Sequence, residues 1–477
     1  MNFKKYLNNF DEKKLISRSL KLKFSRDKKS IIFACPLDHF YLHLYSEIVK
    51  KEQKNNLNFI GVIEIPIALS KTDILLVIPF LIKKISQKFL EYKWKRLYKS
   101  IGISKFYVPR KNNFKILILA FLKFKSIKLN KELNDLQINN IYCGDLICDT
   151  FIRFSNSKLP KVSIKSLAMF VVFYRTMQVI FAYEKIIVSN NLIKAFIPQT
   201  VYIFNGIPLR LFFLNGIKTF SSASLECLFK EIKKKNDVGS PYASEYKKIF
   251  VKNKYDHNQI KLALDKFSSR FKGSDDIGWL NIFGKNQYNP KNQENNQNEL
   301  NGLDGVLFLH DFYDGNKFYG NSLFLDFFSW TEFTLNLIAN NNIKVGIKPH
   351  PFQMSLSEKT VHYFKIKYPN LIWLDSNISN NQIFKSDISF GITQHGTVIS
   401  ELAFHKIIPI FCGDCPIEFF KIGFKANTIE EYQKLILNFK DLQLNENTEN
   451  ELGIYYYMHH IFNKNDYELG QEKTDGF

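Results

Sequence analysis

Residues 388–413 read ISFGITQHGTVISELAFHKIIPIFCG, and their pattern indicates the fold class. Two short apolar runs, 388–393 and 407–411, flank a segment whose apolar residues recur at helical spacing. Short apolar runs predict buried strands, and a strand, a helix and a second strand in succession predict a right-handed parallel βαβ unit. The stretch therefore predicts an α/β fold with a parallel sheet.

The same alternation extends over the rest of the chain. Upstream in the C-terminal part, strand-like runs occupy residues 305–309, 344–347 and 371–374. The N-terminal part contains strand-like runs at 30–35, 58–65, 140–142 and 201–204, and a helix-like segment at 164–188. Strands that alternate with helices in both parts predict two Rossmann-like domains with parallel sheets. In such sheets, ligands bind at the carboxyl ends of the strands.

Length and composition indicate the number of domains. The chain has 477 residues, 45% hydrophobic and 15% aromatic, so it can bury two or three cores. This composition excludes a disordered chain, and the length excludes a small disulfide-stapled scaffold. Residues 285–302 (KNQYNPKNQENNQNELNG) are rich in Asn and Gln, which do not pack a core. We predict an N-terminal domain at 1–280, a linker or loop at 281–302, a C-terminal domain at 303–430, and a helical tail at 431–477 that packs back on the first domain.

The charge of the chain is unevenly distributed. Its 66 basic and 45 acidic residues give a formal net charge of +21. Residues 1–302 contain 52 basic and 24 acidic residues, a net +28, whereas residues 303–477 contain 14 basic and 21 acidic residues, a net −7. A basic excess suits nucleic acid, anionic lipid or phosphorylated substrates, so the total alone does not choose among them.

Targeting and cysteine patterns indicate a cytoplasmic protein with reduced thiols. The N-terminal residues MNFKKYLNNFDEKK lack the apolar core of a secretory signal. The apolar run at 74–82 has nine residues, which is too short to span a bilayer. Six cysteines in so long a chain do not form a disulfide framework, and Cys412 and Cys415 have no second pair with which to hold a metal. We expect neither a bound metal nor a cofactor.

Polar residues follow three of the predicted C-terminal strands, where a plain connection would not need them. The candidate ligand-binding residues are His310, Lys348, His350, Gln394, His395, Gly396 and Thr397. Two prolines stiffen the segment Lys348-Pro-His350-Pro, and an ammonium group beside an imidazole suits a phosphate. Gly396 lets a ligand approach the backbone, and Thr397 begins a helix whose free amides attract anions. These loops predict an anion site, with ordinary loop histidines as the alternative.

A carboxylate follows the last of these loops. Glu401 comes four residues after Thr397 and therefore lies one turn further along the same helix face. There it suits the hydroxyl groups of a ribose or a sugar, which donate hydrogen bonds to carboxylates. The alternative is that Glu401 caps the helix or forms an ion pair.

Several motifs between residues 306 and 416 carry a resemblance to a known family. They are LFLHDFYDG (307–315), FLDFFSW (324–330), KPHP (348–351), TVISE (397–401) and IPIFCG (408–413). In these motifs the chain resembles the C-terminal half of bacterial capsule and surface polysaccharide biosynthesis glycosyltransferases of the GT-B type, a group that includes Kdo transferases. At 396–397 the chain has Gly-Thr where the family usually has Ser-Thr.

The resemblance implies a GT-B-like fold, in which two Rossmann-like domains face a central cleft. It implies that the C-terminal domain binds a nucleotide-sugar donor, with CMP-linked donors among the candidates. The N-terminal domain would bind the acceptor, a growing surface polysaccharide that can be lipid-linked. Related folds leave three alternatives: a polyol-phosphate transferase, a nucleotide-sugar epimerase, and a catalytically silent membrane-associated glycan assembly protein.

The N-terminal domain would then supply the catalytic base. Residues 144–153 (GDLICDTFIR) follow a short predicted strand and faintly resemble a G-D-x-x-x-D-x-x-x-R stretch of the same family. The candidates are Asp149, Asp145 and Asp38 for the base and Arg153 for orienting the substrate, with His39 as a rival base. Two carboxylates one helical turn apart can divide the roles of base and orienting group. The alternative is that they only stabilise the start of a helix.

A basic and apolar segment covers residues 83–128. It contains 14 basic residues and one acidic residue, Glu91, and therefore almost half of the N-terminal excess of +28. Its aromatic and apolar residues include Phe89, Tyr92, Trp94, Leu97 and Tyr98. Such mixtures suit anionic lipid headgroups, so we predict a peripheral association with the inner face of the cytoplasmic membrane. The alternatives are a nucleic-acid surface, in which aromatic side chains stack on bases, and a solvated helix face above a core.

Overall fold

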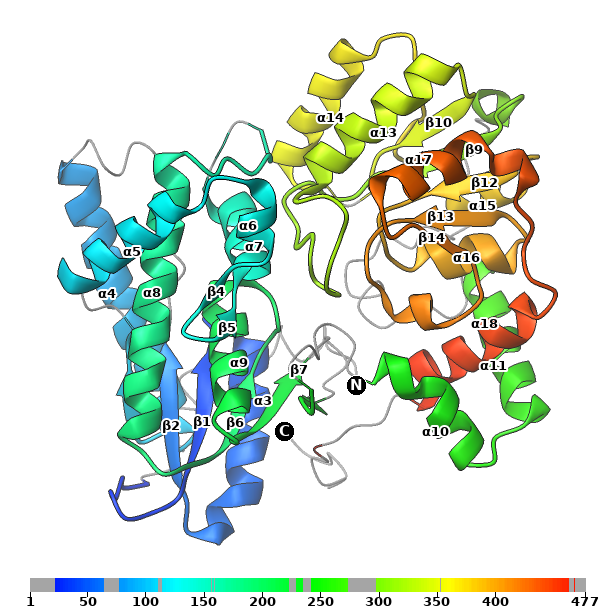
Figure 1. The fold of residues 1–477 in the computed structure, drawn as a ribbon. Helices are drawn as coiled ribbons and strands as arrows, with labels where there is room; N and C mark the ends of the chain where they lie inside the picture. Colours follow the sequence, from blue (N-terminus) through cyan, green and yellow to red (C-terminus); the bar gives the residue numbers. More distant parts are fainter. Residues whose placement is uncertain are drawn as a thin grey trace. The chain divides into compact units, whose positions relative to one another are not determined.

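The structure is a computed structural model, and it divides the chain into two compact units (Figure 1). The described residues are 22–63, 77–109, 114–155, 157, 159–222, 229–234, 242–272, 297–351, 353–462 and 467. Unit 1 comprises Met1–Asn156, Ser163–Pro241 and Lys464–Phe477, and unit 2 comprises Ser157–Val162 and Tyr242–Asn463. Each unit has its own parallel sheet, so the prediction of an α/β chain with two Rossmann-like units is confirmed.

Unit 1 is built on a six-stranded sheet with the strand order β3-β2-β1-β6-β7-β8. Its strands are β1 (Ser30–Cys35), β2 (Asn58–Ile63), β3 (Lys105–Tyr107), β6 (Leu192–Ile197), β7 (Lys218–Ser222) and β8 (Phe229–Glu231). The first five pair in parallel, and β8 pairs antiparallel to β7. Crossovers lead from the central β1 to both sides, as in a doubly wound Rossmann-like domain.

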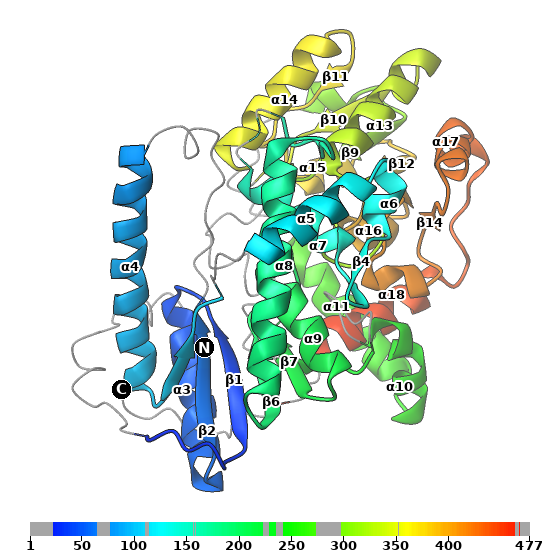
Figure 2. The same ribbon diagram turned by 60° about the vertical axis from the view of Figure 1, so that its left-hand side comes forward.

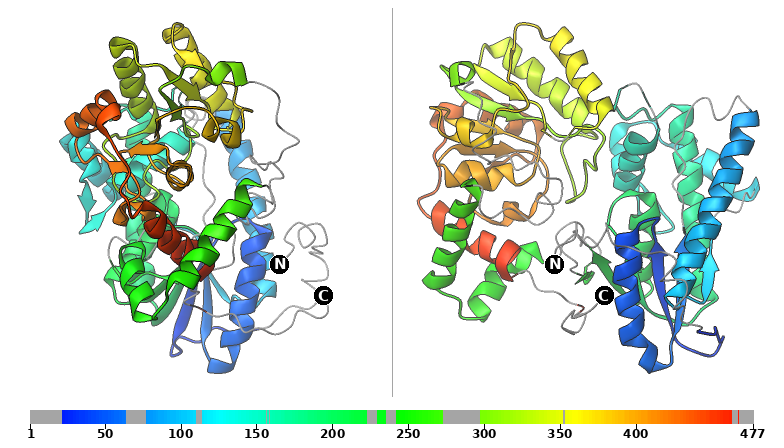
Figure 3. Two further views of the ribbon diagram at one scale, coloured as in Figure 1. Left: turned by 90° about the vertical axis from the view of Figure 1, so that its right-hand side faces the viewer. Right: turned by 180° about the vertical axis from the view of Figure 1, so that it is seen from behind.

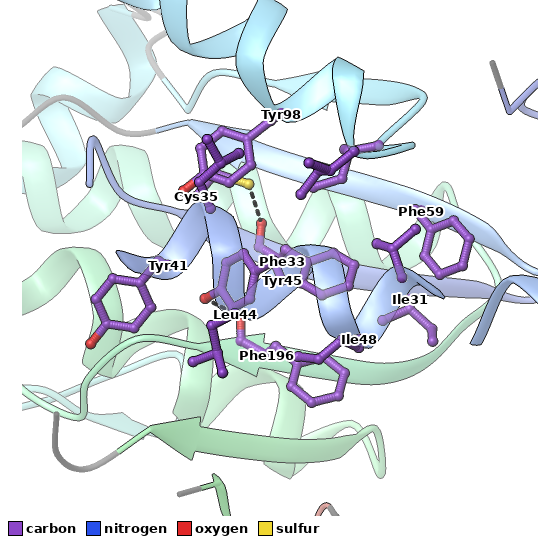
Figure 4. Packing of buried hydrophobic residues seen from close by; sticks show 14 of the residues in the cluster. Ile31, Phe33, Cys35, Tyr41, Leu44, Tyr45, Ile48, Phe59, Tyr98 and Phe196 are labelled. Carbon is purple, nitrogen blue, oxygen red and sulfur yellow. Dashed lines mark hydrogen bonds between the residues drawn. The ribbon is translucent and has the colours of Figure 1, made fainter. Parts of the chain in front are cut away.

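Helices cover both faces of this sheet, which is why all six residues of β1 are buried. The helices of unit 1 are α3 (His39–Glu52), α4 (Val77–Ser100), α5 (Phe114–Ser126), α6 (Asn130–Asn134), α7 (Gly144–Phe154), α8 (Leu167–Val188) and α9 (Ile207–Leu214), of which α5 packs on α8 and α6 on α7. Alternate β1 residues, among them Phe33, pack with Tyr45 of α3 and Tyr98 of α4 in one core (Figure 4). Helices α8 and α9 lie side by side on the other side of the strands (Figure 2).

A stack of aromatic rings runs across the centre of the unit 1 sheet. Phe196 of β6 stacks on Phe33 at 5.4 Å and on Phe220 at 5.1 Å between ring centroids. Tyr467, from the end of the chain, meets the edge of Phe196 at 5.0 Å. Its hydroxyl also donates a 2.8 Å hydrogen bond to the Glu52 carboxylate. Tyr467 therefore completes the core of unit 1.

Unit 2 is built on a six-stranded, entirely parallel sheet with the order β11-β10-β9-β12-β13-β14. Its strands are β9 (Gly305–Phe308), β10 (Val345–Lys348), β11 (Ile372–Trp373), β12 (Phe390–Ile392), β13 (Ile408–Phe411) and β14 (Phe424–Lys425). Five of these lie where the sequence predicted strands, and each agrees with its predicted range to within two residues. The pattern of short apolar runs was reliable here because the four central strands, β9, β10, β12 and β13, are almost completely buried.

The helices of unit 2 fall into two groups. Those between the strands are α13 (Phe327–Asn341), α14 (Ser355–Lys367), α15 (Asn380–Phe384) and α16 (Val398–Phe404). Those outside the strand sequence are α10 (Tyr246–Lys252), α11 (His257–Phe271), α17 (Ile429–Leu437), which follows the last strand, and α18 (Thr448–Tyr456). In this second group, α11 and α18 lie side by side (Figure 3), and Phe267 stacks on Tyr456 at 4.6 Å.

This second group corrects two predicted boundaries. Residues 242–272 belong to unit 2 instead of an N-terminal domain that ends at 280, because α10 and α11 share a core with α16 and α18. Of the predicted tail at 431–477, α17 and α18 also belong to unit 2, and among its described residues only Tyr467 packs in unit 1. Helix amphipathicity does not say which core a helix joins, so the sequence could not separate these cases. Most of the predicted linker lies outside the described residues.

Of the predicted strands of the N-terminal part, one lies outside the main sheet and one is wrong. Residues 140–142 contribute only β5 (Ile141–Tyr142), which pairs with β4 (Gln137–Ile138) in a small separate hairpin. Residues 201–204 lie mostly in a π-helical turn, Tyr202–Gly206, that leads into α9. The main sheet instead contains β6, which the sequence pattern does not predict because a lysine interrupts its apolar run LIKAFI.

The basic segment at 83–128 is divided between core and surface. Trp94, Leu97 and Tyr98 of α4 are buried in the unit 1 core, which corrects the expectation that they form part of a lipid-facing surface. On the same helix, Phe89 and Tyr92 are exposed. Helix spacing explains the difference, because the buried residues recur at three and four positions and so share one face.

One described helix, α8, is long and apolar enough to cross a membrane. Half of its most apolar window is buried inside the unit, where it contacts α5, α7 and α9. Buried residues along it include Val172, Phe173 and Ile180. These contacts are those of a core helix.

We predict that Tyr467→Ala lowers the free energy of unfolding by about 3 kcal/mol, because it removes a buried ring from the aromatic stack. Tyr467→Phe should lower it by only about 1 kcal/mol, because only the hydrogen bond to Glu52 is lost. Urea unfolding followed by circular dichroism measures both. Equal stabilities of the wild type and Tyr467→Ala would contradict the placement of Tyr467 in this core.

Candidate functional site

The predicted ligand-binding residues all lie in unit 2, at or near the carboxyl ends of β9, β10 and β12. His310 follows β9, Lys348 ends β10, and His395 follows β12. Because these strands are neighbours in the parallel sheet, their loops meet at one edge. The rings of His310 and His395 lie 4.7 Å apart. The structure thus brings together the loops that the sequence singled out.

His310 is held in one orientation and one tautomer. Its ring stacks on Phe327 at 4.3 Å between centroids, with 9° between the planes. Its Nε2 lies 3.1 Å from the Thr393 hydroxyl, which itself donates to the carbonyl oxygen of His395 at 2.9 Å. Since that hydroxyl has a single proton, His310 must donate from Nε2, which leaves Nδ1 as the acceptor. Burial lowers the pKa of His310 well below its usual range, and the charges of His395 and His350 lower it further.

Gln394 and His395 form the most buried part of the site. Gln394 Nε2 donates to Asn316 Oδ1 at 2.6 Å, while Asn316 itself donates to two backbone carbonyls of the loop after β9. The other side-chain atom, Gln394 Oε1, is buried and has no hydrogen-bond partner among the described residues. Neither ring nitrogen of His395 makes a hydrogen bond of normal geometry within that same set. Three buried polar atoms are therefore left for another partner.

The His395 ring is neutral at physiological pH. It is 8% exposed and lies beside the rings of His310, Tyr319 and Phe327. Burial lowers the pKa of His395 to about 4, although the Asn316 backbone and the Asp414 charge oppose this shift. A neutral imidazole offers one donor and one acceptor, so His395 can bind a hydroxyl, an amide or a phosphate oxygen.

The Gly396-Thr397 step opens the site toward solvent. Gly396 has a φ of 113°, which is strained for any residue with a side chain, so the Gly at this position has a conformational reason. Thr397 is exposed and precedes α16 without a capping hydrogen bond from its hydroxyl. The Gly-Thr sequence at 396–397 therefore has a backbone reason, because a serine at position 396 would be strained at this φ.

Behind these loops lies a buried polar network. Lys348 Nζ donates to Asn380 Oδ1 at 3.0 Å, and Asn380 Nδ2 donates to Glu401 Oε2 at 3.2 Å. The other oxygen of Glu401 pairs with the Arg270 guanidinium of α11 at 3.0 Å. Lys348, Glu401 and Arg270 are each at most 3% exposed. Within this network Glu401 holds Asn380 and Arg270 in place. This contact is the ion pair that the sequence offered as the alternative to a direct role of Glu401 in ligand binding.

Burial also changes the ionisation of Lys348. It lowers the pKa of Lys348 to about 8, and the Glu401 charge opposes the shift. The ammonium group thus gains and loses its proton close to neutral pH. A cation of this kind at the end of β10 gives the site a charge that pH can remove.

The candidate catalytic residues lie in unit 1, and the structure gives one of them another role. Asp145 at the start of α7 is buried in a bidentate pair with Arg210 of α9, with N–O distances of 2.8 and 2.5 Å. Arg210 also donates to the Tyr142 carbonyl at 2.6 Å. Burial opposes the charge of Arg210, but the Asp145 carboxylate more than offsets this and raises its pKa. A carboxylate locked in this way joins α7 to α9 and is not placed to act as a base.

The other unit 1 candidates occupy three different environments. Asp149 lies on the buried side of α7, Arg153 is exposed near the end of the same helix, and Asp38 is exposed at the start of α3. The Asp38 carboxylate caps that helix by accepting a 2.7 Å hydrogen bond from the Phe40 amide. His39, its neighbour, lies against Trp94 at 5.0 Å. Their catalytic roles remain predictions.

Sequence analysis missed three residues that build the site. Arg270 was assigned to the other domain, and Asn380 and Asn316 lie in segments without a motif of their own. Asn316 directly follows the LFLHDFYDG motif, so its neighbourhood gave a usable signal. Arg270 gave none, because its partner Glu401 is 131 residues away.

The cysteine pair near the site has a structural role. Cys412 and Cys415 are buried, and burial raises the pKa of both thiols. Within the described part of the chain, no three His, Cys, Asp or Glu residues are arranged to hold a metal ion.

We predict that Asp145→Ala lowers the free energy of unfolding by about 3 to 5 kcal/mol, because it leaves the Arg210 charge buried without its partner. The double variant Asp145→Ala/Arg210→Met should recover a large part of this loss. Urea unfolding measures both. If Asp145→Ala unfolded like the wild type, the pair would not have the structural role assigned to it.

Comparisons with known proteins give the chain no family. No family model and no curated protein sequence matches it. Among solved structures, the chain is similar to a UDP-GlcNAc 2-epimerase from Methanocaldococcus jannaschii, at 10% identity and a TM-score of 0.28, with 89% of this chain and 97% of that one covered. It is also similar to HepE from Anabaena, solved with UDP and glucose, at 10% identity and a TM-score of 0.26, with 90% and 93% covered. A glycotransferase of kitacinnamycin matches at 9% identity and a TM-score of 0.22, with 91% and 95% covered. Identities and TM-scores this low carry no argument about the fold, so the fold assignment depends on the two parallel sheets of the structure itself.

Proposed function

We propose that this protein is a glycosyltransferase that moves a sugar from a nucleotide-sugar donor to a growing surface polysaccharide. The observation that carries the proposal is the group of buried polar atoms of Gln394 and His395 at the carboxyl edge of the unit 2 sheet. A buried polar atom without a partner costs roughly 1 to 3 kcal/mol, and a bound ligand with hydroxyl or phosphate groups would offset that cost. The motif resemblance supports a nucleotide sugar as this ligand.

Each part of the proposed donor site has a chemical role. The cationic form of Lys348 would attract the phosphates, and His350 on the same loop would donate to them. The neutral ring of His395 would bind the ligand through one donor and one acceptor. His310, whose Nε2 proton is committed to Thr393, would accept a hydrogen bond from the ligand at Nδ1. The exposed backbone around Gly396 would approach the donor closely. Glu401 would act through Asn380, by keeping Lys348 in place.

Transfer also needs a base that removes the proton of the acceptor hydroxyl. With Asp145 committed to Arg210, we propose Asp149 or Asp38 for this role, with Arg153 orienting the acceptor. The proposed acceptor is a glycan, in its lipid-linked form at the inner face of the cytoplasmic membrane. CMP, UDP, CDP and GDP are all candidates for the donor nucleotide.

A nucleotide-sugar epimerase is the second candidate, because the proposed donor site would serve it equally well. The two functions differ in what they need. An epimerase turns over a nucleotide sugar by itself, and one that inverts a carbon by removing and returning its proton gives, in deuterated water, a product with deuterium at that carbon. A transferase, including a polyol-phosphate transferase, releases the nucleotide only when an acceptor is present. Mass spectrometry of a reaction without acceptor therefore separates the two.

We predict that His395→Ala and His350→Ala each weaken nucleotide binding by about 10- to 100-fold, since each loses a hydrogen bond to the ligand. Titration calorimetry with UDP, CDP, CMP and GDP identifies the nucleotide and measures the loss. His362→Ala is the matched control, because His362 is an exposed histidine on α14 of the same unit. Thermal unfolding checks that each variant is folded.

The outcomes of this experiment are distinct. Loss of affinity in both site variants with no change in His362→Ala supports the site. Unchanged affinity in the folded site variants contradicts it. If no nucleotide binds the wild type, the enzyme proposals fail together and the silent assembly protein becomes the better account.

A second prediction concerns pH. Because the pKa of Lys348 is about 8, its cationic form predominates at pH 7 and is lost as pH rises, while the ligand phosphates stay ionised. Nucleotide affinity should therefore fall by about tenfold between pH 7 and pH 9. In Lys348→Met the affinity should be low and nearly independent of pH over this range. A wild-type affinity that stays constant to pH 9 would exclude Lys348 from the site.

A further inference from the structure

We propose that α5 of unit 1 presents a docking face for an anionic lipid bilayer. The face consists of Phe114, Leu117, Ile118, Phe121 and Leu122. Their positions follow the helical spacing of three and four, so they form one continuous strip. This inference names the membrane partner of the proposed function, but it depends only on the structure of unit 1.

The opposite side of α5 already has a partner. Ile116 and Ala120 are buried, and Phe124 meets Phe170 and Phe173 of α8 at 5.6 and 5.7 Å. The helix is therefore attached to the unit by its inner residues. Phe121 of the outer strip also meets Phe170 of α8, at 6.0 Å between ring centroids, but it keeps 47% of its surface exposed.

The outer strip is exposed to an unusual degree for apolar side chains. Phe114 is 76% exposed and Leu122 59%, and the three residues between them are 36 to 47% exposed. Leu117, Ile118 and Phe121 also line, with Phe170, a hollow of about 250 Å³ whose walls are almost entirely apolar. A contiguous apolar surface of this kind marks an interaction site.

The charges around the strip favour an anionic bilayer as the partner. Helix α5 contains Lys115, Lys123 and Lys125 and no acidic residue, and Lys128 follows it. The first acidic residue downstream, Glu132, accepts hydrogen bonds from the backbone amides of residues 128 and 129, at 2.6 and 3.0 Å. Lysines beside an apolar strip suit a bilayer, because the ammonium groups can contact anionic headgroups while the apolar side chains enter the acyl-chain region.

Two other partners fit these observations less well. A nucleic acid would need aromatic or guanidinium planes for stacking, whereas three of the five strip residues are aliphatic and all the helix cations are lysines. A second copy of the chain that presented the same face would place these lysines against one another. The bilayer alone accounts for both the aliphatic residues and the charge.

Vesicle flotation without nucleotide tests the proposal. The full-length protein should bind vesicles of phosphatidylcholine with 30% phosphatidylglycerol, and bind phosphatidylcholine alone far more weakly. Phe114→Asp/Leu122→Asp should reduce binding by at least about tenfold. The matched control is Val251→Asp/Ile366→Asp, which changes two apolar residues of similar exposure, 74% and 68%, in unit 2. This control should bind like the wild type.

The charge contribution is tested separately. Lys123→Glu/Lys125→Glu should bind the anionic vesicles about tenfold or more weakly, and 0.5 M NaCl should weaken the wild type in the same direction. Lys359→Glu/Lys434→Glu, two exposed lysines of unit 2, is the control. Thermal unfolding confirms that each variant is folded.

Insertion has its own readout. Trp fluorescence of Phe114→Trp should shift to shorter wavelength on anionic vesicles and be quenched by brominated acyl chains, whereas Val251→Trp should not change. The proposal is overturned if phosphatidylglycerol does not increase the binding of the wild type, or if both apolar double variants bind vesicles equally. It is also overturned if the strip variants instead lose self-association or binding to single-stranded RNA. Nucleotide affinity should be the same in all these variants, so failure of the docking face is distinguishable from failure of the donor site.

Discussion

The buried carboxylate of Glu401 is the constraint on which unit 2 depends. It is 2% exposed and must be paired, because removing one partner of a buried ion pair typically costs about 3 to 5 kcal/mol. One oxygen pairs with Arg270 of α11, and the other accepts a hydrogen bond from Asn380. The side-chain oxygen of Asn380 in turn accepts a hydrogen bond from the Lys348 ammonium group. A single side chain therefore attaches a helix from outside the strand sequence and positions a cation at the sheet edge.

The edge of the unit 2 sheet combines rigid and unsatisfied groups. His310 is fixed by Phe327 and by the Thr393 hydroxyl, so its tautomer is determined by the protein alone. Beside it, Gln394 and His395 keep buried polar atoms that make no hydrogen bond of normal geometry within the described part of the chain. Preorganised neighbours with open hydrogen-bonding groups are what a ligand site requires, and only the neighbouring loops of a parallel sheet bring these residues together.

Unit 1 uses its apolar helices in two ways. Helix α8 is the more hydrophobic over its length, yet half of its most apolar window is covered by the unit itself. Helix α5 packs one side on α8 and leaves a second apolar side exposed beside several lysines. Composition alone does not distinguish these cases, because both helices are apolar and both carry basic residues. The difference lies in how many sides of each helix have neighbours.

The sequence by itself determined the α/β class, five of the six strands of unit 2, and the loops that form its candidate site. These features depend on local patterns, since a buried strand must be apolar and its loop must begin where the run ends. The tertiary structure alone decided that α10, α11 and α18 join unit 2, that Asp145 pairs with Arg210, and that Tyr467 completes the first core. Each is a contact between residues at least 65 positions apart, or a choice between two cores. Local spacing carries no information about such pairs, because they depend on which surfaces meet after the chain has folded.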